Sequence, residues 1–341
     1  MKRRALLVGA LLMPLPAGAR TSKQKQVTKK PPAAPTKPAV KPGPSATDAK
    51  TQLVAFHASA FPYSGIVPDT NKPFLYTKNG KMRGHTSLRG EVYWEDPTYA
   101  DRRSLLYLPP GFDVQRPSLI VLYLHGQGAS LERDVVNRQA VPRQVAESGL
   151  NAALVAPQLA VDAGDSSAGN FWRPGHFANY IDEAAERLRR LQGDRRAGAN
   201  FNQAPVVIVA YSGGYVATAY ALDRGGASHR IKGVILLDAL YGEEDKFAAW
   251  AAARRRQAFL LSAYTESTRD ENAILQGLLD KRRVPYSRNL PSGLGAGTFA
   301  FAACGGIDLH GDFVTRAWRP DPLKHALGMI PGYALRAKQG A

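Results

Sequence analysis

From about residue 103 onward, the apolar residues form short continuous runs separated by longer segments of helical periodicity. A run such as "LIVLYL" at 119–124 does not alternate with polar residues, which is typical of a parallel strand buried on both faces. Runs of this kind predict strands within 103–108, 118–124, 151–158, 205–211, 231–238, 257–264 and 297–304. The segments between them predict helices within 177–191, 214–225, 243–256 and 270–283.

This alternation of strands and helices predicts the α/β class, with a doubly wound, mostly parallel sheet and helices on both faces. The connection over 239–257 is too short to hold a large lid domain, so an open cleft is expected. Residues 53–102 are rich in Pro, Tyr and Gly and are expected to form an N-terminal extension that packs on the sheet. The main domain then occupies residues 103–341.

The first 19 residues have the three parts of a secretory signal peptide: Lys2, Arg3 and Arg4, an apolar stretch over 5–15, and the small residues of 17–19. The apolar stretch is shorter than the roughly 20 residues needed to span a bilayer. We therefore expect export to the periplasm or the extracellular space, and no stable membrane span after cleavage. An uncleaved N-terminal anchor is the alternative.

Residues 20–52 are rich in Lys, Pro, Ala and Thr and predict a disordered linker. Residues 1–50 hold 11 Lys and Arg against one acid, so they contribute most of the net charge of +17. Positive charge concentrated in a disordered segment argues against nucleic acid as a partner. The basic linker could contact anionic envelope polymers, or it could act as a solvated spacer. Cys304 is the single cysteine, which excludes an intramolecular disulfide and a zinc site built from cysteines.

Ser212 lies between the apolar run 205–211 and a run of small residues. Gly213 and Gly214 permit a sharp turn, and amides at a helix N-terminus can stabilise a negative oxygen. Serine is also a common helix N-cap, which is the structural alternative to a nucleophile.

Other chemically capable residues follow neighbouring strands, and ligands bind at the carboxyl ends of such strands. The turn 125–128, "HGQG", can present an amide to an oxyanion. Asp238 ends an apolar run, where a carboxylate requires hydrogen bonds. His310 follows the last strand, so the chain order is serine, acid, histidine.

Over residues 103–320 the chain resembles the α/β-hydrolases, on the segments "YLPPGFDVQRPSLIVLYLHGQG", "VVIVAYSGGY" and "DLHGDF". The resemblance implies Ser212 as nucleophile, His310 as general base, and the amides of Gly213 and Gln127 as the oxyanion hole. The acid is Asp238 or Glu266, with Asp238 favoured because it is the shorter carboxylate directly at a strand end. Asp308 is a third candidate, although its place two residues before His310 is typical of a turn-former. Ala210 departs from the G-x-S-x-G pattern by one methyl group.

Three further residues are candidates for contact with substrate: His125, Trp172 and Tyr211. Each also has a structural interpretation: His125 as a ring that orients its turn, Trp172 as an aromatic plug, and Tyr211 as a residue that packs against a helix. The expected reaction is hydrolysis of a small-molecule or polymer ester through an acyl-enzyme, which needs no metal or organic cofactor. The alternatives are a non-catalytic binding protein of the same fold, and a peptidase or amidase that uses the same residues.

Overall fold

A computed structural model describes residues 49–193 and 197–335 of the chain. The predicted signal peptide (1–19) and nearly all of the predicted linker (20–52) lie outside the described residues. Within the described part, no helix is both long enough and apolar enough to cross a membrane.

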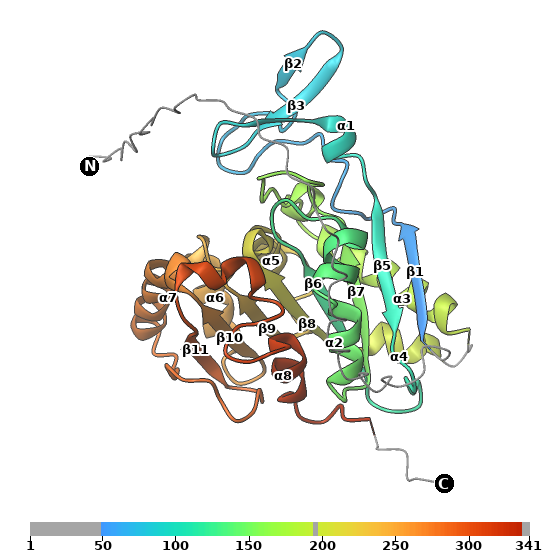
Figure 1. Ribbon diagram of the computed structural model, residues 1–341, viewed down its shortest axis with the longest axis vertical. Helices are drawn as coiled ribbons and strands as arrows, with labels where there is room; N and C mark the ends of the chain where they lie inside the picture. Colours follow the sequence, from blue (N-terminus) through green and yellow to red (C-terminus); the bar gives the residue numbers. More distant parts are fainter. Residues whose placement is uncertain (1–48, 194–196, 336–341) are drawn as a thin grey trace, which may run out of the picture. The chain divides into compact units, whose positions relative to one another are not determined.

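The centre of the fold is an eight-stranded sheet with the order β1-β5-β7-β6-β8-β9-β10-β11 (Figure 1). Its neighbouring strands are parallel from β7 to β11, and β5 runs antiparallel to both β1 and β7. The strands are β1 (Lys50–Ala55), β5 (Arg103–Leu108), β6 (Leu119–Leu124), β7 (Ala152–Pro157), β8 (Val206–Tyr211), β9 (Ile231–Leu237), β10 (Phe259–Tyr264) and β11 (Phe299–Ala303).

Helices cover both faces of this sheet, and the predicted fold class is confirmed. Successive residues of β6 pack into two different cores: Ile120 and Leu122 face one, and Val121 and Tyr123 face the other. The first core is covered by α3 (His176–Gln192), α4 (Ala197–Gln203), α5 (Tyr215–Arg224), α6 (Glu244–Arg254) and α7 (Arg269–Lys281). The second is covered by the π-helical turn η2 (Leu131–Arg138), α2 (Val141–Glu147) and α8 (Pro322–Gly328), which lie nearest the viewer in Figure 1.

All seven predicted strands and all four predicted helices are present. The continuous apolar runs became strands because both of their faces are buried, as in β6, β7 and β8, where every residue is buried. The connection from β9 to β10 carries α6, the helix predicted within 243–256.

The boundary between linker and extension was placed too late, because residues 50–52 form the first half of β1. This strand is held by backbone pairing with β5, while its first three side chains are exposed. An edge strand with exposed side chains carries little hydrophobic pattern, so this strand could not be recognised from its apolar residues.

The rest of the N-terminal extension forms a separate antiparallel sheet of β2 (Thr77–Asn79), β3 (Met82–Thr86) and β4 (Val92–Trp94), followed by the short α1 (Glu95–Thr98). Its connecting segments bury an aromatic cluster of Phe61, Phe74 and Tyr99, and Trp172 packs edge-on against Phe74. Aromatic residues, rather than a strand pattern, therefore join this segment to the main domain.

Candidate active site

Ser212 stands on a sharp turn between β8 and α5, at the start of the short 3₁₀ turn η4 (Ser212–Gly214). Its backbone φ is +49°, a left-handed conformation that non-glycine residues adopt rarely and at a cost. The close packing around this turn requires glycine at two positions, Gly214 in the turn itself and Gly126 in the segment that packs against it. A Cβ on Gly214 would lie 2.4 Å from the carbonyl oxygen of Leu124, and one on Gly126 would lie 2.8 Å from Cβ of Ser212.

Ala210, where the G-x-S-x-G pattern has its first glycine, does not disturb this turn. It is fully buried in β8 and pairs with Leu124 of β6 and Leu236 of β9. The extra methyl group is therefore part of the core, and the strained backbone begins two residues later, at Ser212.

His310 reaches Ser212 from the turn η6 (Ile307–Asp312), which follows β11. Its Nε2 lies 3.0 Å from the Ser212 hydroxyl oxygen. The hydroxyl of Tyr211 donates a hydrogen bond of 2.8 Å to the His310 carbonyl oxygen, and the two rings stack with centroids 5.5 Å apart. Tyr211 is 6% exposed and holds the histidine turn in place, which supports its interpretation as a packing residue and not the predicted contact with substrate.

Asp238 lies directly after β9, has a φ of +46° and is fully buried. Its Oδ2 lies 2.6 Å from Nδ1 of His310. Four more hydrogen bonds reach the carboxylate from the loop after β10: from the Thr265 amide and hydroxyl, and from the hydroxyls of Ser267 and Thr268, at 2.8–2.9 Å. Burial alone would raise the pKa of Asp238, but the bonds from His310, Thr265 and Thr268 outweigh it and hold the pKa below its usual value.

The structure brings Asp238, and not Glu266, to the histidine. The Glu266 side chain is 56% exposed and forms an ion pair of 2.9 Å with Arg269. Its neighbours Thr265 and Ser267 point to Asp238 instead, so this loop supplies hydroxyl groups to the acid and not the acid itself.

Gln127 and Gly213 come together beside Ser212. A Cβ on Gly213 would lie 3.3 Å from the backbone nitrogen of Gln127 and 2.6 Å from Oγ of Ser166. The Gln127 side chain donates a hydrogen bond of 2.9 Å to that same Ser166 oxygen. A side chain at position 213 would therefore crowd the Gln127 amide, which is predicted to bind an oxyanion together with the amide of Gly213.

His125 is 1% exposed, which gives no support to the prediction that it contacts substrate. Its Nδ1 donates to the carbonyl oxygen of Gly126 at 2.8 Å, and its Nε2 accepts from the amide of Leu159 at 2.9 Å. Burial lowers the pKa of His125, which keeps the ring neutral in this arrangement. Its role is to hold the 125–128 turn.

Trp172 is also buried, at 7% exposure, which supports its interpretation as an aromatic plug and not the predicted contact with substrate. It ends the turn η3 (Gly169–Trp172) and packs edge-on against Tyr63 and Tyr220, as an aromatic plug.

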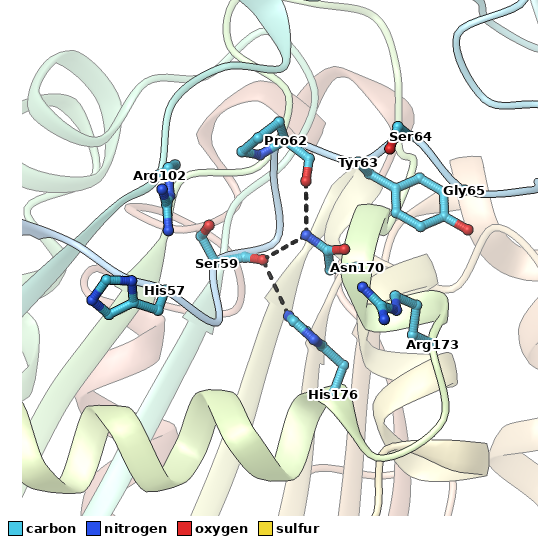
Figure 2. A pocket seen from close by; sticks show the side chains of 10 residues that line it. All are labelled: His57, Ser59, Pro62, Tyr63, Ser64, Gly65, Arg102, Asn170, Arg173 and His176. Carbon is cyan, nitrogen blue, oxygen red and sulfur yellow. Dashed lines mark hydrogen bonds between the residues drawn. The ribbon is translucent and has the colours of Figure 1, made fainter.

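A cavity lies apart from these residues, between the N-terminal extension and the start of α3 (Figure 2). It has a volume of about 500 Å³ and does not include Ser212, His310 or Asp238. Figure 2 shows Asn170 and His176 reaching the backbone of the extension, including the Ser59 carbonyl oxygen. Its lining residues are His57, Ser59, Pro62, Tyr63, Ser64, Gly65, Arg102, Asn170, Arg173 and His176.

Two groups of residues at the site were not anticipated from the sequence. Three hydroxyl side chains follow a strand in "TEST" (265–268). If the acid had been known, this cluster would have been recognisable as a loop that binds its carboxylate. Tyr241, whose hydroxyl lies 3.1 Å from Nδ1 of His310, carries no sequence pattern that indicates its position.

Comparison with solved structures finds hydrolases at low identity, among them several esterases and a dipeptidyl peptidase 4 from Porphyromonas gingivalis. A feruloyl esterase module from Clostridium thermocellum is 12% identical with a TM-score of 0.43, over 84% of this chain and 100% of that one. An S-formylglutathione hydrolase from Agrobacterium tumefaciens is 14% identical with a TM-score of 0.38, over 74% and 97% of the two chains. A ferulic acid esterase from Anaeromyces mucronatus is 14% identical with a TM-score of 0.38, over 77% and 97%.

A scan against protein-family models finds no match, and neither does a search of curated proteins. The structural similarities, with TM-scores below 0.5, assign no role to any residue of this chain.

Proposed function

We propose that this chain, whose fold is that of the α/β-hydrolases, is a serine hydrolase that cleaves carboxylic esters. One observation carries the proposal: Ser212, held in a left-handed conformation, is joined by hydrogen bonds of 3.0 Å and 2.6 Å through His310 to the buried Asp238. A helix N-cap serine needs no such partners. The arrangement is that of a nucleophile, its base and the group that orients the base.

The reaction begins when Oγ of Ser212 attacks the carbonyl carbon of the ester and its proton passes to Nε2 of His310. The amides of Gly213 and Gln127 donate hydrogen bonds to the oxyanion that forms. Collapse of the tetrahedral intermediate breaks the bond to the alcohol, which takes the proton from Nε2. Water then repeats the sequence on the acyl-enzyme and releases the acid.

Asp238 has two tasks in this mechanism. By accepting from Nδ1–H of His310, it selects the tautomer whose Nε2 can accept the serine proton. Its negative charge then stabilises the imidazolium. The hydrogen bonds that lower its pKa keep the carboxylate charged, so it is ready for both tasks.

Hydrolysis of 4-nitrophenyl esters of increasing acyl length tests this function, with the matched 4-nitroanilides as amide controls. We expect the wild type to cleave the esters and Ser212→Ala to lose at least 10³-fold in kcat/KM. Ser64→Ala removes an exposed serine at the cavity of Figure 2 and should retain full activity. If the wild type cleaves anilides faster than esters, the proposed function is wrong and the protein is an amidase. If Ser64→Ala loses activity, the active site lies at that cavity and not at Ser212.

We also propose that the chain acts after export, on the strength of the signal-peptide pattern at 1–19. Expression of the full chain in a bacterium with separable compartments tests this. The expected product is an extracytoplasmic protein whose N-terminus lies close to Arg20. An intact Met1 in the cytoplasmic fraction would contradict the proposal.

A further inference from the structure

Tyr241 lies three residues after Asp238, in the loop that leads from β9 to α6. Its hydroxyl is 3.1 Å from Nδ1 of His310 and 2.9 Å from Oγ of Ser267. The Tyr241 and His310 rings are nearly perpendicular, with centroids 5.8 Å apart. The tyrosine hydroxyl thus approaches the same imidazole nitrogen that Asp238 contacts.

The hydrogen positions follow from the acceptors. Nδ1 of His310 must carry a proton if Nε2 is to accept from Ser212, and this Nδ1–H points to Asp238 Oδ2 at 2.6 Å. The Ser267 hydroxyl donates to that same carboxylate oxygen at 2.9 Å, which leaves the Ser267 oxygen free to accept from Tyr241. The oxygen of Tyr241 then faces Nδ1–H of His310 as a second acceptor.

We infer that Tyr241 and Ser267 are positioning residues, which give Nδ1–H of His310 a second acceptor path that ends on Asp238. The inference rests on the proposed function, since it concerns the base of that reaction. The path runs from His310 to Tyr241, from Tyr241 to Ser267, and from Ser267 to Asp238. It closes a ring of hydrogen bonds with the direct contact between His310 and Asp238.

No proton moves along this ring during the reaction. Nε2 takes the Ser212 proton and returns it to the leaving group, while Nδ1 keeps its own proton throughout. Burial raises the pKa of Tyr241 to about 12, so its hydroxyl stays protonated and neutral. The tyrosine oxygen contributes a lone pair directed at a hydrogen that becomes more positive when the imidazolium forms.

Removal of one hydroxyl at a time tests the inference, with the second-order rate constant of fluorophosphonate labelling at Ser212 as the readout. Tyr241→Phe and Ser267→Ala should each lower this rate constant by roughly 5- to 30-fold, the effect of losing one hydrogen bond near a charged group. Ser267→Thr keeps a hydroxyl and should restore most of the rate. Unchanged labelling in both Tyr241→Phe and Ser267→Ala would overturn the inference.

Tyr180→Phe is the matched control, because it also deletes a buried hydroxyl that is bonded to a serine, Ser104, at 3.0 Å. Ser104 and Tyr180 lie on β5 and α3, outside the Ser212 site, so this variant should label within twofold of wild type. An equal loss in Tyr180→Phe would mean that the rates report general destabilisation, and would overturn the assignment of Tyr241.

A second readout does not depend on activity. The Nδ1–H proton of His310 should give a downfield NMR resonance that is absent in His310→Gln. In Tyr241→Phe we expect this resonance to shift and its exchange with water to accelerate; an unchanged resonance would overturn the inference. Should wild-type Ser212 take no label, the proposed function fails, while the resonance still decides whether Tyr241 holds the imidazole.

Discussion

At the scale of single residues, the site depends on how the fold stabilises the buried negative charge of Asp238. Asp238 is fully buried, and a buried carboxylate is stable only when its oxygens are saturated with hydrogen bonds. Thr265, Ser267 and Thr268 supply these bonds, together with His310. The same contacts that stabilise the charge fix the direction in which it faces the imidazole.

The choice between the two acids can be tested by matched substitutions. Asp238→Asn leaves Nδ1–H of His310 without its charged acceptor and favours the wrong tautomer, so kcat/KM should fall by about 10³- to 10⁴-fold. Glu266→Gln removes an exposed charge paired with Arg269 and should change kcat/KM by less than twofold. Steady-state kinetics on one ester compare the two variants. The reverse order of effects would assign the acid to Glu266.

The lowered pKa of Asp238 also predicts how stability depends on pH. A carboxyl group whose pKa is lower in the folded state contributes stability above its unfolded pKa of about 3.9, and this contribution is lost as pH falls through the folded value. Asp238→Asn should therefore cost about 1–3 kcal/mol at pH 7. That cost should shrink progressively below about pH 4.

Chemical unfolding of wild type and Asp238→Asn at pH 7, 5, 4 and 3 provides the measurement. A difference in unfolding free energy that stays constant across this range would show that the carboxylate is not held in its charged form by the fold.

At the scale of elements, the turn between β8 and α5 places the nucleophile. Its glycines allow Ser212 to approach β6, since a Cβ on Gly214 would meet the Leu124 carbonyl oxygen. This contact is with backbone, which cannot move aside as a flexible side chain could.

Gly214→Ala should accordingly destabilise the protein by about 1–3 kcal/mol and slow reactions at Ser212. Gly277→Ala is the control: Gly277 lies within α7, a Cβ there meets nothing within 4 Å, and alanine should stabilise the helix by about 0.5–1 kcal/mol. Thermal unfolding of both variants measures the effects. Equal stability of Gly214→Ala and wild type would show that the turn is looser than described.

The sequence predicted those elements whose burial leaves a pattern in the chain. β6 and β8 are buried on both faces and were recognised from their continuous apolar runs. β1 was missed because its first side chains face outward and backbone pairing holds it.

The site was predicted to a similar extent. Ser212, Asp238 and His310 each follow a strand, and parallel topology brings strand ends together, so their meeting could be foreseen. The burial of His125 and Trp172, and the approach of Tyr241 to His310, depend on side-chain packing between distant segments, which no local pattern encodes.

At the scale of the whole molecule, charge and chemistry belong to different parts of the chain. Residues 20–50, which remain after the predicted cleavage, carry 8 Lys and Arg against one acid, whereas Ser212, His310 and Asp238 all lie in the domain that follows. We propose that the basic segment contacts anionic polymers independently of catalysis, by a charge interaction that salt screens.

Removal of residues 20–48 from the mature chain should therefore abolish salt-sensitive retention on an anionic polysaccharide column and leave the rate of ester hydrolysis within twofold. The cut precedes β1, which begins at Lys50, so the sheet keeps its edge strand. Retention of the shortened chain at the same salt concentration would place the anionic contact on the main domain.

The central claim is that Ser212 is an activated nucleophile, and covalent labelling by a fluorophosphonate, followed by peptide mass spectrometry, tests it most directly. We expect a single adduct on the peptide that contains Ser212, no adduct in Ser212→Ala, and greatly slowed labelling in His310→Gln. A folded wild type that takes no label, or an adduct that persists in Ser212→Ala, would contradict the proposed mechanism.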